Sequence, residues 1–213
     1  MYIQLWLDFS CPYCYIGKHN LDVALNQLLP EQRNQVRSIY RSFELEPKAP
    51  KVNVLTGDER LAQKYQCGIE QARMIAEKVT TMAKASGLKF DLDKYVPANS
   101  FKAHQLVQFA MTQQKEGLLI ESLFQAHFSW GLNINDEDVL LQLASTIGID
   151  MAACGDALND EHYAKAVRLD QIRAKQIRIS SVPFYVFNEQ YAAQGVQPVD
   201  VFVGAIQNSL SKN

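Results

Sequence analysis

Apolar and polar positions divide the first part of the chain into a β-α-β pattern. Residues 2–9 form an apolar, β-prone run, and residues 16–28 repeat apolar side chains at helical spacing. Residues 35–45 return to a strand-like pattern that Pro47 closes. This order predicts two parallel strands joined by a helix. Residues 47–58 contain prolines, a glycine and no helical period, which predicts a connecting loop.

The middle of the chain shows helical periodicity and no strand pattern. One helix is expected to begin at Asn135, an N-cap residue type that acidic residues follow. A longer helix is expected over residues 156–177, with a basic C-terminal end. The other helical patterns cover residues 72–82, 103–111 and 119–126.

A β pattern returns in "SVPFYVFNEQYAAQG", where two short apolar runs flank Asn188 and Glu189. Such runs around a short polar turn predict an antiparallel hairpin. The last helix is expected from about Pro198, with an apolar stripe along one face.

These elements favour an α/β fold whose sheet takes strands from both ends of the chain, with a helical block inserted between them. The boundaries are predicted at residues 1–55 and 165–213 for the discontinuous α/β domain. Residues 56–164 are predicted to form the helical insertion.

Composition agrees with a soluble globular protein. Of the 213 residues, 47% are hydrophobic and 21% are charged, which is an ordinary balance. The formal net charge is −2 and the basic residues are scattered, which argues against nucleic acid as a partner. The start of the sequence has no secretory-signal pattern, and no run approaches the roughly 18 apolar residues of a membrane span. We therefore expect a cytoplasmic protein without a membrane partner.

The candidate chemistry lies in "DFSCPYCYIGK", where Cys11 and Cys14 flank Pro12 and Tyr13 at the expected junction of strand and helix. A metal clip, a structural disulfide, a redox pair and two inert buried thiols are the alternatives. A structural zinc site needs four Cys or His ligands, and this pair supplies two. A reducing compartment disfavours a purely structural disulfide.

The position of the pair favours redox chemistry. A helix N-terminus stabilises a thiolate and so lowers the pKa of Cys11. Pro12 suits the first helical turn because it needs no amide hydrogen. Cys14 lies one turn later and can close a disulfide with Cys11. We expect Cys11 to be the exposed attacking thiol and Cys14 the shielded resolving thiol.

Motifs along nearly the whole chain resemble the DsbA family of the thioredoxin-like superfamily, specifically its FrnE-like branch of dithiol oxidoreductases. The matching stretches are "DFSCPYCYIGK", "SFELEP", "ANSFKAHQL", "LFQAHFSWGLNINDEDVL" and "SVPFYVFNEQYAAQGVQPVDVF". The resemblance implies a thioredoxin-like fold with an inserted α-helical domain.

The resemblance also implies that the Cys-x-x-Cys pair faces a loop with a cis-proline, which Val182 and Pro183 match. There, the backbone of Val182 would pair with an extended substrate beside Cys11. An ordinary trans proline at the start of a strand is the alternative. The chain departs from the family at Tyr13, where a tryptophan is usual, and in "SSVPFY", where the approach to the proline is usually richer in glycine. These departures leave the redox potential open.

The function expected from the motif and the resemblance is thiol-disulfide exchange on protein or small-molecule substrates. The only cofactor would be the redox-active Cys11–Cys14 disulfide, with glutathione as a co-substrate option and no metal. An alternative is a glutathione-dependent isomerase or transferase related to 2-hydroxychromene-2-carboxylate isomerase and to kappa-class glutathione transferases. Those relatives carry serines at the positions of both cysteines. A third alternative is a binding module without enzymatic activity.

Several further residues are candidates for the site. Substrate-binding residues are predicted at Pro12, Tyr13, Val182, Pro183 and His104. For His104 the alternative is a packing role. Glu44 or Glu46 could place a proton acceptor near Cys14, but exposed strand charges are favoured.

Two further features concern the rest of the chain. Cys67 and Cys154 are expected to be buried single cysteines. Apolar helices of the insertion could supply the surface of a homodimer.

Overall fold

The computed structural model divides the chain into two compact units. One consists of Met1–Leu45 and Asp170–Asn213, and the other of Glu46–Leu169. The borders fall after residues 45 and 169, compared with the predicted borders after residues 55 and 164. The structure describes residues 1–49, 55 and 57–211.

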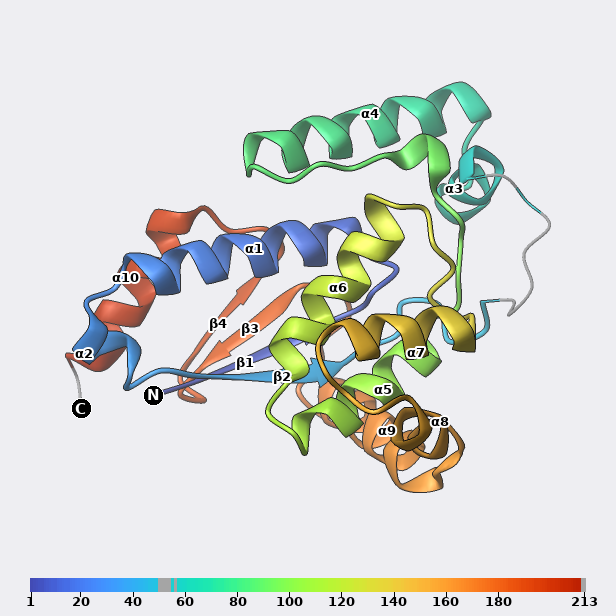
Figure 1. Ribbon diagram of the computed structural model, residues 1–213. Coiled ribbons are helices and arrows are strands. Elements are labelled where there is room, and N and C mark those ends of the chain that lie inside the picture. The colour runs from blue at the N-terminus through green and yellow to red at the C-terminus, as the bar shows by residue number, and fades with distance from the viewer. Residues whose placement is uncertain (50–54, 56, 212–213) are drawn as a thin grey trace. The chain divides into compact units, whose positions relative to one another are not determined.

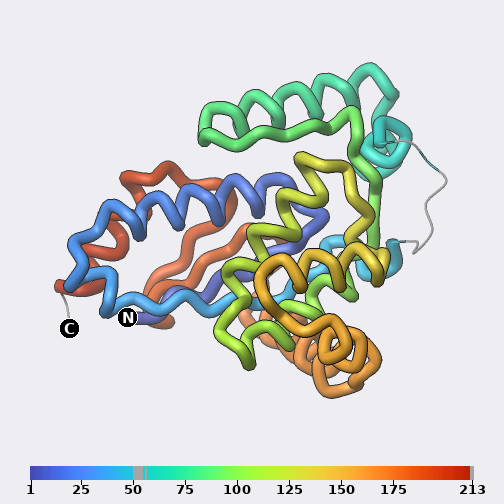
Figure 2. Tube along the Cα trace, viewed as in Figure 1, coloured from blue at the N-terminus to red at the C-terminus, as the bar shows by residue number. Residues whose placement is uncertain are grey.

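The first unit is built on a mixed sheet that draws on both ends of the chain. Among the described residues its strands are β1 (Tyr2–Leu7), β2 (Arg37–Ser42), β3 (Phe184–Phe187) and β4 (Tyr191–Gln194), in the order β2-β1-β3-β4. β1 pairs with β2 in parallel and with β3 antiparallel. Figure 2 shows the N-terminal strand next to the strands of the C-terminal segment. The predicted α/β fold with strands from both ends of the chain is confirmed.

Two helices cover one face of this sheet. α1 (Pro12–Gln27) and α10 (Val199–Leu210) pack against each other on the same side (Figure 1). Alternate residues of β1 point into this layer because strand side chains alternate between faces. The buried side chains of the core include Ile3, Leu5, Leu7, Ile16, Leu21, Tyr185, Phe202 and Ile206.

The predicted hairpin joins β3 to β4. Asn188 and Glu189 have φ angles of 47° and 59°, and two consecutive positive φ values are typical of the tight turns that join twisted strands. The amide of Tyr2 donates a hydrogen bond of 2.7 Å to the Asn188 side-chain oxygen. This bond ties the turn to the start of β1.

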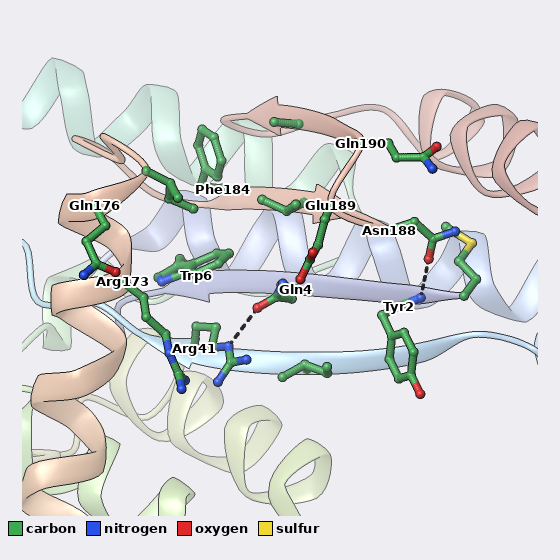
Figure 3. A pocket seen from close by; sticks show the side chains of 15 residues that line it. Tyr2, Gln4, Trp6, Arg41, Arg173, Gln176, Phe184, Asn188, Glu189 and Gln190 are labelled. Carbon is green, nitrogen blue, oxygen red and sulfur yellow. Dashed lines mark hydrogen bonds between the residues drawn. The ribbon is translucent and has the colours of Figure 1, made fainter.

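The other face of the sheet borders an open pocket of about 1180 Å³. Figure 3 shows Gln4 and Trp6 from β1 and Arg41 from β2 along its wall. Asp170 on α9 (Glu161–Gln176) is buried beside this wall, accepts from the Ser42 amide at 3.1 Å and pairs with Arg41. These bonds connect the second half of α9 to the end of β2.

The second unit is helical in its described part. Its core includes Leu119, Leu123 and Phe124 of α6, which are fully buried. The described residues of this unit form no strand, as the lack of a strand pattern in the middle of the sequence predicts. Its elements are α3 (Gly57–Tyr65), α4 (Ile69–Ala85), η1 (Leu92–Lys94), α5 (Phe101–Met111), α6 (Glu116–Phe128), α7 (Glu137–Thr146), α8 (Met151–Asn159) and the first part of α9.

The structure corrects two helix predictions. The single helix expected over residues 156–177 is interrupted, because Asp160 has extended backbone angles and its carboxylate accepts from the His162 amide at 2.8 Å. This residue ends α8 and caps α9. The N-cap of α7 is Asp136, whose side chain accepts from the Asp138 amide, and Asn135 lies one residue before it.

Two further differences concern short segments. Pro30–Arg33 form a short helix, α2, that the sequence pattern did not predict. The predicted loop over residues 47–58 overlaps residues 50–54 and 56, which lie outside the described residues, and its last two residues belong to α3. Among the described helices, none combines the length and the apolar character that crossing a membrane requires.

Candidate active site

The Cys-Pro-Tyr-Cys motif lies where β1 gives way to α1. Cys11 is the N-cap residue of α1, with an extended backbone (φ −105°, ψ 109°), and Pro12 is the first helical residue. The Cys14 amide donates to the Cys11 carbonyl at 3.0 Å, which closes the first turn. The turn therefore holds both cysteines at the helix N-terminus, where free amides and the helix dipole favour negative charge.

The Val182–Pro183 segment lies against this helix start. Cys11 Sγ is 3.6 Å from the Val182 carbonyl oxygen, close enough for the thiol to donate a weak hydrogen bond. The peptide bond between Val182 and Pro183 is cis. Pairing of Trp6 with Phe184 places this segment beside the end of β1. Residues separated by 171 positions in the sequence thus form one site.

Cys14 is the more deeply placed of the two thiols. It is fully buried, and its sulfur accepts a hydrogen bond of 3.4 Å from the Asp8 amide. Burial raises the pKa of Cys14 well above its usual range, and the hydrogen bond and charge of Cys11 raise it further. Cys14 is therefore a protonated thiol at neutral pH. The structure holds Cys11 and Cys14 as free thiols.

The prediction that Cys11 is exposed is wrong for this structure. Its relative exposure is 3%, because the Val182 segment lies over its sulfur. Pro12 and Tyr13, which lie between the cysteines, are both partly exposed. A substrate that reaches Cys11 has to displace the contact between the sulfur and the Val182 carbonyl.

The acid next to the dithiol is Asp8, which the sequence interpretation missed. Asp8 is buried, and its carboxylate accepts from the Leu45 amide at 2.7 Å and from both the amide and the hydroxyl of Ser10. Its charge contributes to the raised pKa of Cys14. The sequence did contain a signal for Asp8, because it is a single acidic residue at the end of an apolar strand, three positions before Cys11.

Neither of the two predicted acids takes that place. Glu44 is buried and accepts from Gln171 Nε2 at 2.7 Å, so the favoured description of it as an exposed strand charge is wrong. Glu46 belongs to the helical unit and pairs with Arg60 and Lys64. The pKa of Cys14 responds to Cys11 and Asp8 instead.

The remaining candidates lie in the helical unit. His104 is buried on α5, and its predicted role in substrate binding stays a prediction. Cys154 is fully buried, as expected. Cys67 follows Gln66, which has a positive φ, and is partly exposed, so the prediction that Cys67 is buried is wrong. Within the described residues, no cluster of three or more His, Cys, Asp or Glu side chains could hold a metal ion.

Comparison with solved structures agrees with this architecture. A probable DsbA oxidoreductase from Streptomyces coelicolor is 30% identical, with a TM-score of 0.89 over 100% of this chain and 91% of the other. The cytosolic disulfide reductase DsbM from Pseudomonas aeruginosa, solved with GSH, is 14% identical, with a TM-score of 0.70 over 99% and 100%. A 2-hydroxychromene-2-carboxylate isomerase is 16% identical with the same TM-score over 100% and 98%. The last two likenesses concern the fold alone.

Sequence comparisons cover the same span. The uncharacterized protein YwbO of Bacillus subtilis is 25% identical over 215 residues, which is 100% of this chain and 98% of that protein. The model of the DSBA-like thioredoxin domain matches residues 2–207. The assignment to the FrnE-like branch stays a prediction. The match over nearly the whole chain shows that this protein belongs to the family of DsbA-like thioredoxin domains and has the fold of its thiol oxidoreductases.

Proposed function

We propose that this protein is a thiol-disulfide oxidoreductase in which Cys11 attacks the substrate and Cys14 resolves the mixed disulfide. The observation that carries the proposal is the asymmetry of the pair. Cys11 caps α1 beside the Val182–Pro183 segment, and Cys14 is fully buried one turn further along the helix. Family membership supports oxidoreductase chemistry at this level.

The first step is attack by the Cys11 thiolate on a substrate disulfide. The N-terminus of α1 favours the thiolate over the thiol. The sulfur forms a new bond to one substrate sulfur, the substrate disulfide breaks, and the other substrate sulfur leaves as a thiolate. The contact between Cys11 Sγ and the Val182 carbonyl opens as substrate enters.

The second step uses Cys14. Its thiol loses a proton to the substrate thiolate released in the first step or to water and attacks Cys11 Sγ, which forms the Cys11–Cys14 disulfide and releases the second substrate sulfur as a thiolate. Two electrons have then passed from the dithiol to the substrate. Because Cys14 is buried and protonated at rest, it does not compete with Cys11 for substrate.

The Val182–Pro183 segment is the docking edge in this proposal. The Pro183 carbonyl accepts from the Gly195 amide at 2.8 Å, so it is already used within the fold. Within the described residues, the Val182 amide has no hydrogen-bond acceptor. It is available to an extended substrate backbone that adds along this segment. Pro12 and Tyr13 supply the partly exposed surface next to it.

The test is the reduction of a disulfide substrate by three variants. Cys11→Ser is expected to lose at least about 99% of turnover, because no nucleophile remains. Cys14→Ser is expected to accumulate a mixed disulfide with the substrate on Cys11, detectable by mass spectrometry. Cys67→Ser, a partly exposed cysteine outside the motif, is the matched control and is expected to keep wild-type turnover.

Full turnover by Cys11→Ser would overturn the proposal. Glutathione-dependent isomerase activity that survives loss of both thiols would favour the isomerase alternative. Undiminished client binding by alkylated protein, without any exchange activity, would favour a binding module. Equilibration of the wild-type protein with a glutathione buffer, read by thiol alkylation, then gives the direction in which the pair works.

A further inference from the structure

The hydroxyl of Tyr185 is buried against α1, next to Gly17. Tyr185 lies on β3, two residues after Pro183, and its side chain has an exposure of 0%. Within the described residues, its hydroxyl has no hydrogen-bond partner. Buried tyrosine hydroxyls are nearly always paired, so an unpaired one in the interior requires an explanation.

Gly17 provides the space that the hydroxyl occupies. A Cβ on Gly17 would lie 2.2 Å from the Tyr185 oxygen and 3.0 Å from Pro183 Cγ. Gly17 follows Cys14 by three residues on α1, so the two positions share a helix face. The hydroxyl therefore lies against the dithiol face of α1, next to the Val182–Pro183 segment.

The ring of Tyr185 is fixed by its neighbours. Phe202 of α10 meets it edge to face with centroids 4.8 Å apart, and Phe187 stacks at 6.5 Å. These two rings hold the hydroxyl beside Gly17 of α1 in the structure.

The hydroxyl responds to charge on the dithiol. Burial raises the pKa of Tyr185 well above its usual range, and negative charge on Cys14, then on Cys11, raises it further. The group consequently keeps its proton at neutral pH. It is an O–H donor on which the charge of Cys14 acts more strongly than the charge of Cys11.

We propose that the Tyr185 hydroxyl donates a hydrogen bond to Cys14 Sγ as the negative charge develops on that sulfur in the resolving step. The inference rests on the proposed function. Cys14 first gives its proton to the substrate thiolate released in the first step or to water; Cys14 Sγ then bonds to Cys11 Sγ, the bond from Cys11 to the second substrate sulfur breaks, and that sulfur leaves as a thiolate. The tyrosine keeps its own proton and stabilises the charge between these events. In the resting dithiol the hydroxyl has no hydrogen-bond partner among the described residues, so Cys14 Sγ has to move toward it in the resolving step for this bond to form.

The test separates the two steps with dithiobis(nitrobenzoate), an aromatic disulfide that releases one coloured thiolate at each step. All proteins carry Cys67→Ser so that the more exposed thiol does not react. In Tyr185→Phe, the first release is expected to keep its rate within about twofold. The second release is expected to slow about tenfold or more, as suits loss of a hydrogen bond to a charged group. Mixed disulfide on Cys11 should accumulate in parallel.

Tyr40→Phe is the matched control. Tyr40 lies opposite Leu5 on β2, as Tyr185 does on β3, so this variant removes a hydroxyl from the same face of the sheet on another strand. Both releases are expected at wild-type rates. If Tyr185→Phe does not fold, Gly17→Ala is the second variant, because its Cβ displaces the hydroxyl while the tyrosine stays.

Three results would overturn the inference. An unchanged second release in Tyr185→Phe shows that the hydroxyl does not act in resolution. Equal slowing of both releases shows a structural role only. A wild-type protein that never releases the second equivalent contradicts the proposed function as well, and this outcome is distinct because it does not depend on Tyr185.

Discussion

At the scale of single residues, burial separates the four cysteines. Cys14 and Cys154 are fully buried, Cys11 is covered by the Val182 segment, and Cys67 is partly exposed. Burial raises the pKa of Cys14 and of Cys154, because removal from water disfavours the thiolate. Location in the fold, more than spacing in the sequence, decides which sulfur reacts.

Because the thiol of Cys154 is buried, we expect the free energy of unfolding to depend on pH. Burial, followed by the charge of Asp150, raises the pKa of Cys154 to about 11. The folded state then holds this proton more tightly than the unfolded state, whose thiol titrates near about 8.5. The contribution to stability is fully present below the unfolded pKa and is lost as the pH rises toward the folded value.

The measurement is urea unfolding at pH 8 and at pH 10.5. Between these two values, the wild-type protein is expected to lose about 1–2 kcal/mol more of its free energy of unfolding than Cys154→Ala does. Cys67→Ala, which removes a more exposed thiol, should follow the wild-type pH dependence. The same loss in Cys154→Ala as in the wild type would contradict the assignment.

The sequence identified some site residues and missed others for a physical reason. Cys11 and Cys14 were predicted from their spacing, and Val182 and Pro183 were predicted from the family resemblance. Asp8 and Tyr185 are single residues in apolar strands, and their importance depends on what packs against them. Tyr185 becomes notable only when Gly17 is seen to face its hydroxyl, and no local pattern encodes that contact.

At the scale of elements, the contact between α1 and β3 depends on Gly17, which has no side chain. A Cβ on Gly17 would meet the Tyr185 oxygen at 2.2 Å, which is closer than atoms can approach without a shift. Gly17→Ala is therefore expected to cost about 1–3 kcal/mol of stability through overpacking. Its greater helix propensity offsets only part of this cost.

A double-mutant cycle tests this contact by chemical denaturation. In the Tyr185→Phe background, Gly17→Ala should cost at least about 1 kcal/mol less, because the closest clash is gone. The rescue should be partial, since Pro183 Cγ would still lie 3.0 Å from the new Cβ. Gly204→Ala on α10, where a Cβ would meet nothing within 4 Å, is the control and should not be destabilising. An equal cost of Gly17→Ala in both backgrounds would contradict the packing described.

The elements that sequence patterns predicted best are those with a strong local signal. The hairpin turn at Asn188 and Glu189 was predicted because two short apolar runs flank these polar residues. The break at Asp160 was missed, because apolar periodicity continues across it and only the carboxylate bond to the His162 amide ends one helix and begins the next.

At the scale of the whole molecule, the sheet order makes the first unit depend on both ends of the chain. β1 is paired on both sides, by β2 and by β3, whereas β4 lies at an edge. Opening of β3 removes one of the two strands that pair with β1. The two strands should therefore share one unfolding event although they are far apart in the sequence.

Native-state hydrogen exchange of the full chain checks this expectation. Amides of Leu5 and Tyr185, which pair directly, are expected to share the slowest exchange and the same dependence on denaturant. Amides on the outer side of β4 should exchange faster by local fraying. Rapid exchange at Tyr185 while Leu5 stays protected would contradict a single cooperative sheet.

The separation of 171 positions between Cys11 and Val182 also matters while the protein is being made. A ribosome adding about 5 to 20 residues per second leaves the dithiol without its covering segment for about 10 to 35 seconds. During that interval the nascent chain carries two uncovered sulfurs and no docking edge. A transcript that ends early would therefore yield reactive thiols without an enzyme, and oxidants present during synthesis would meet the cysteines before the fold can shield them.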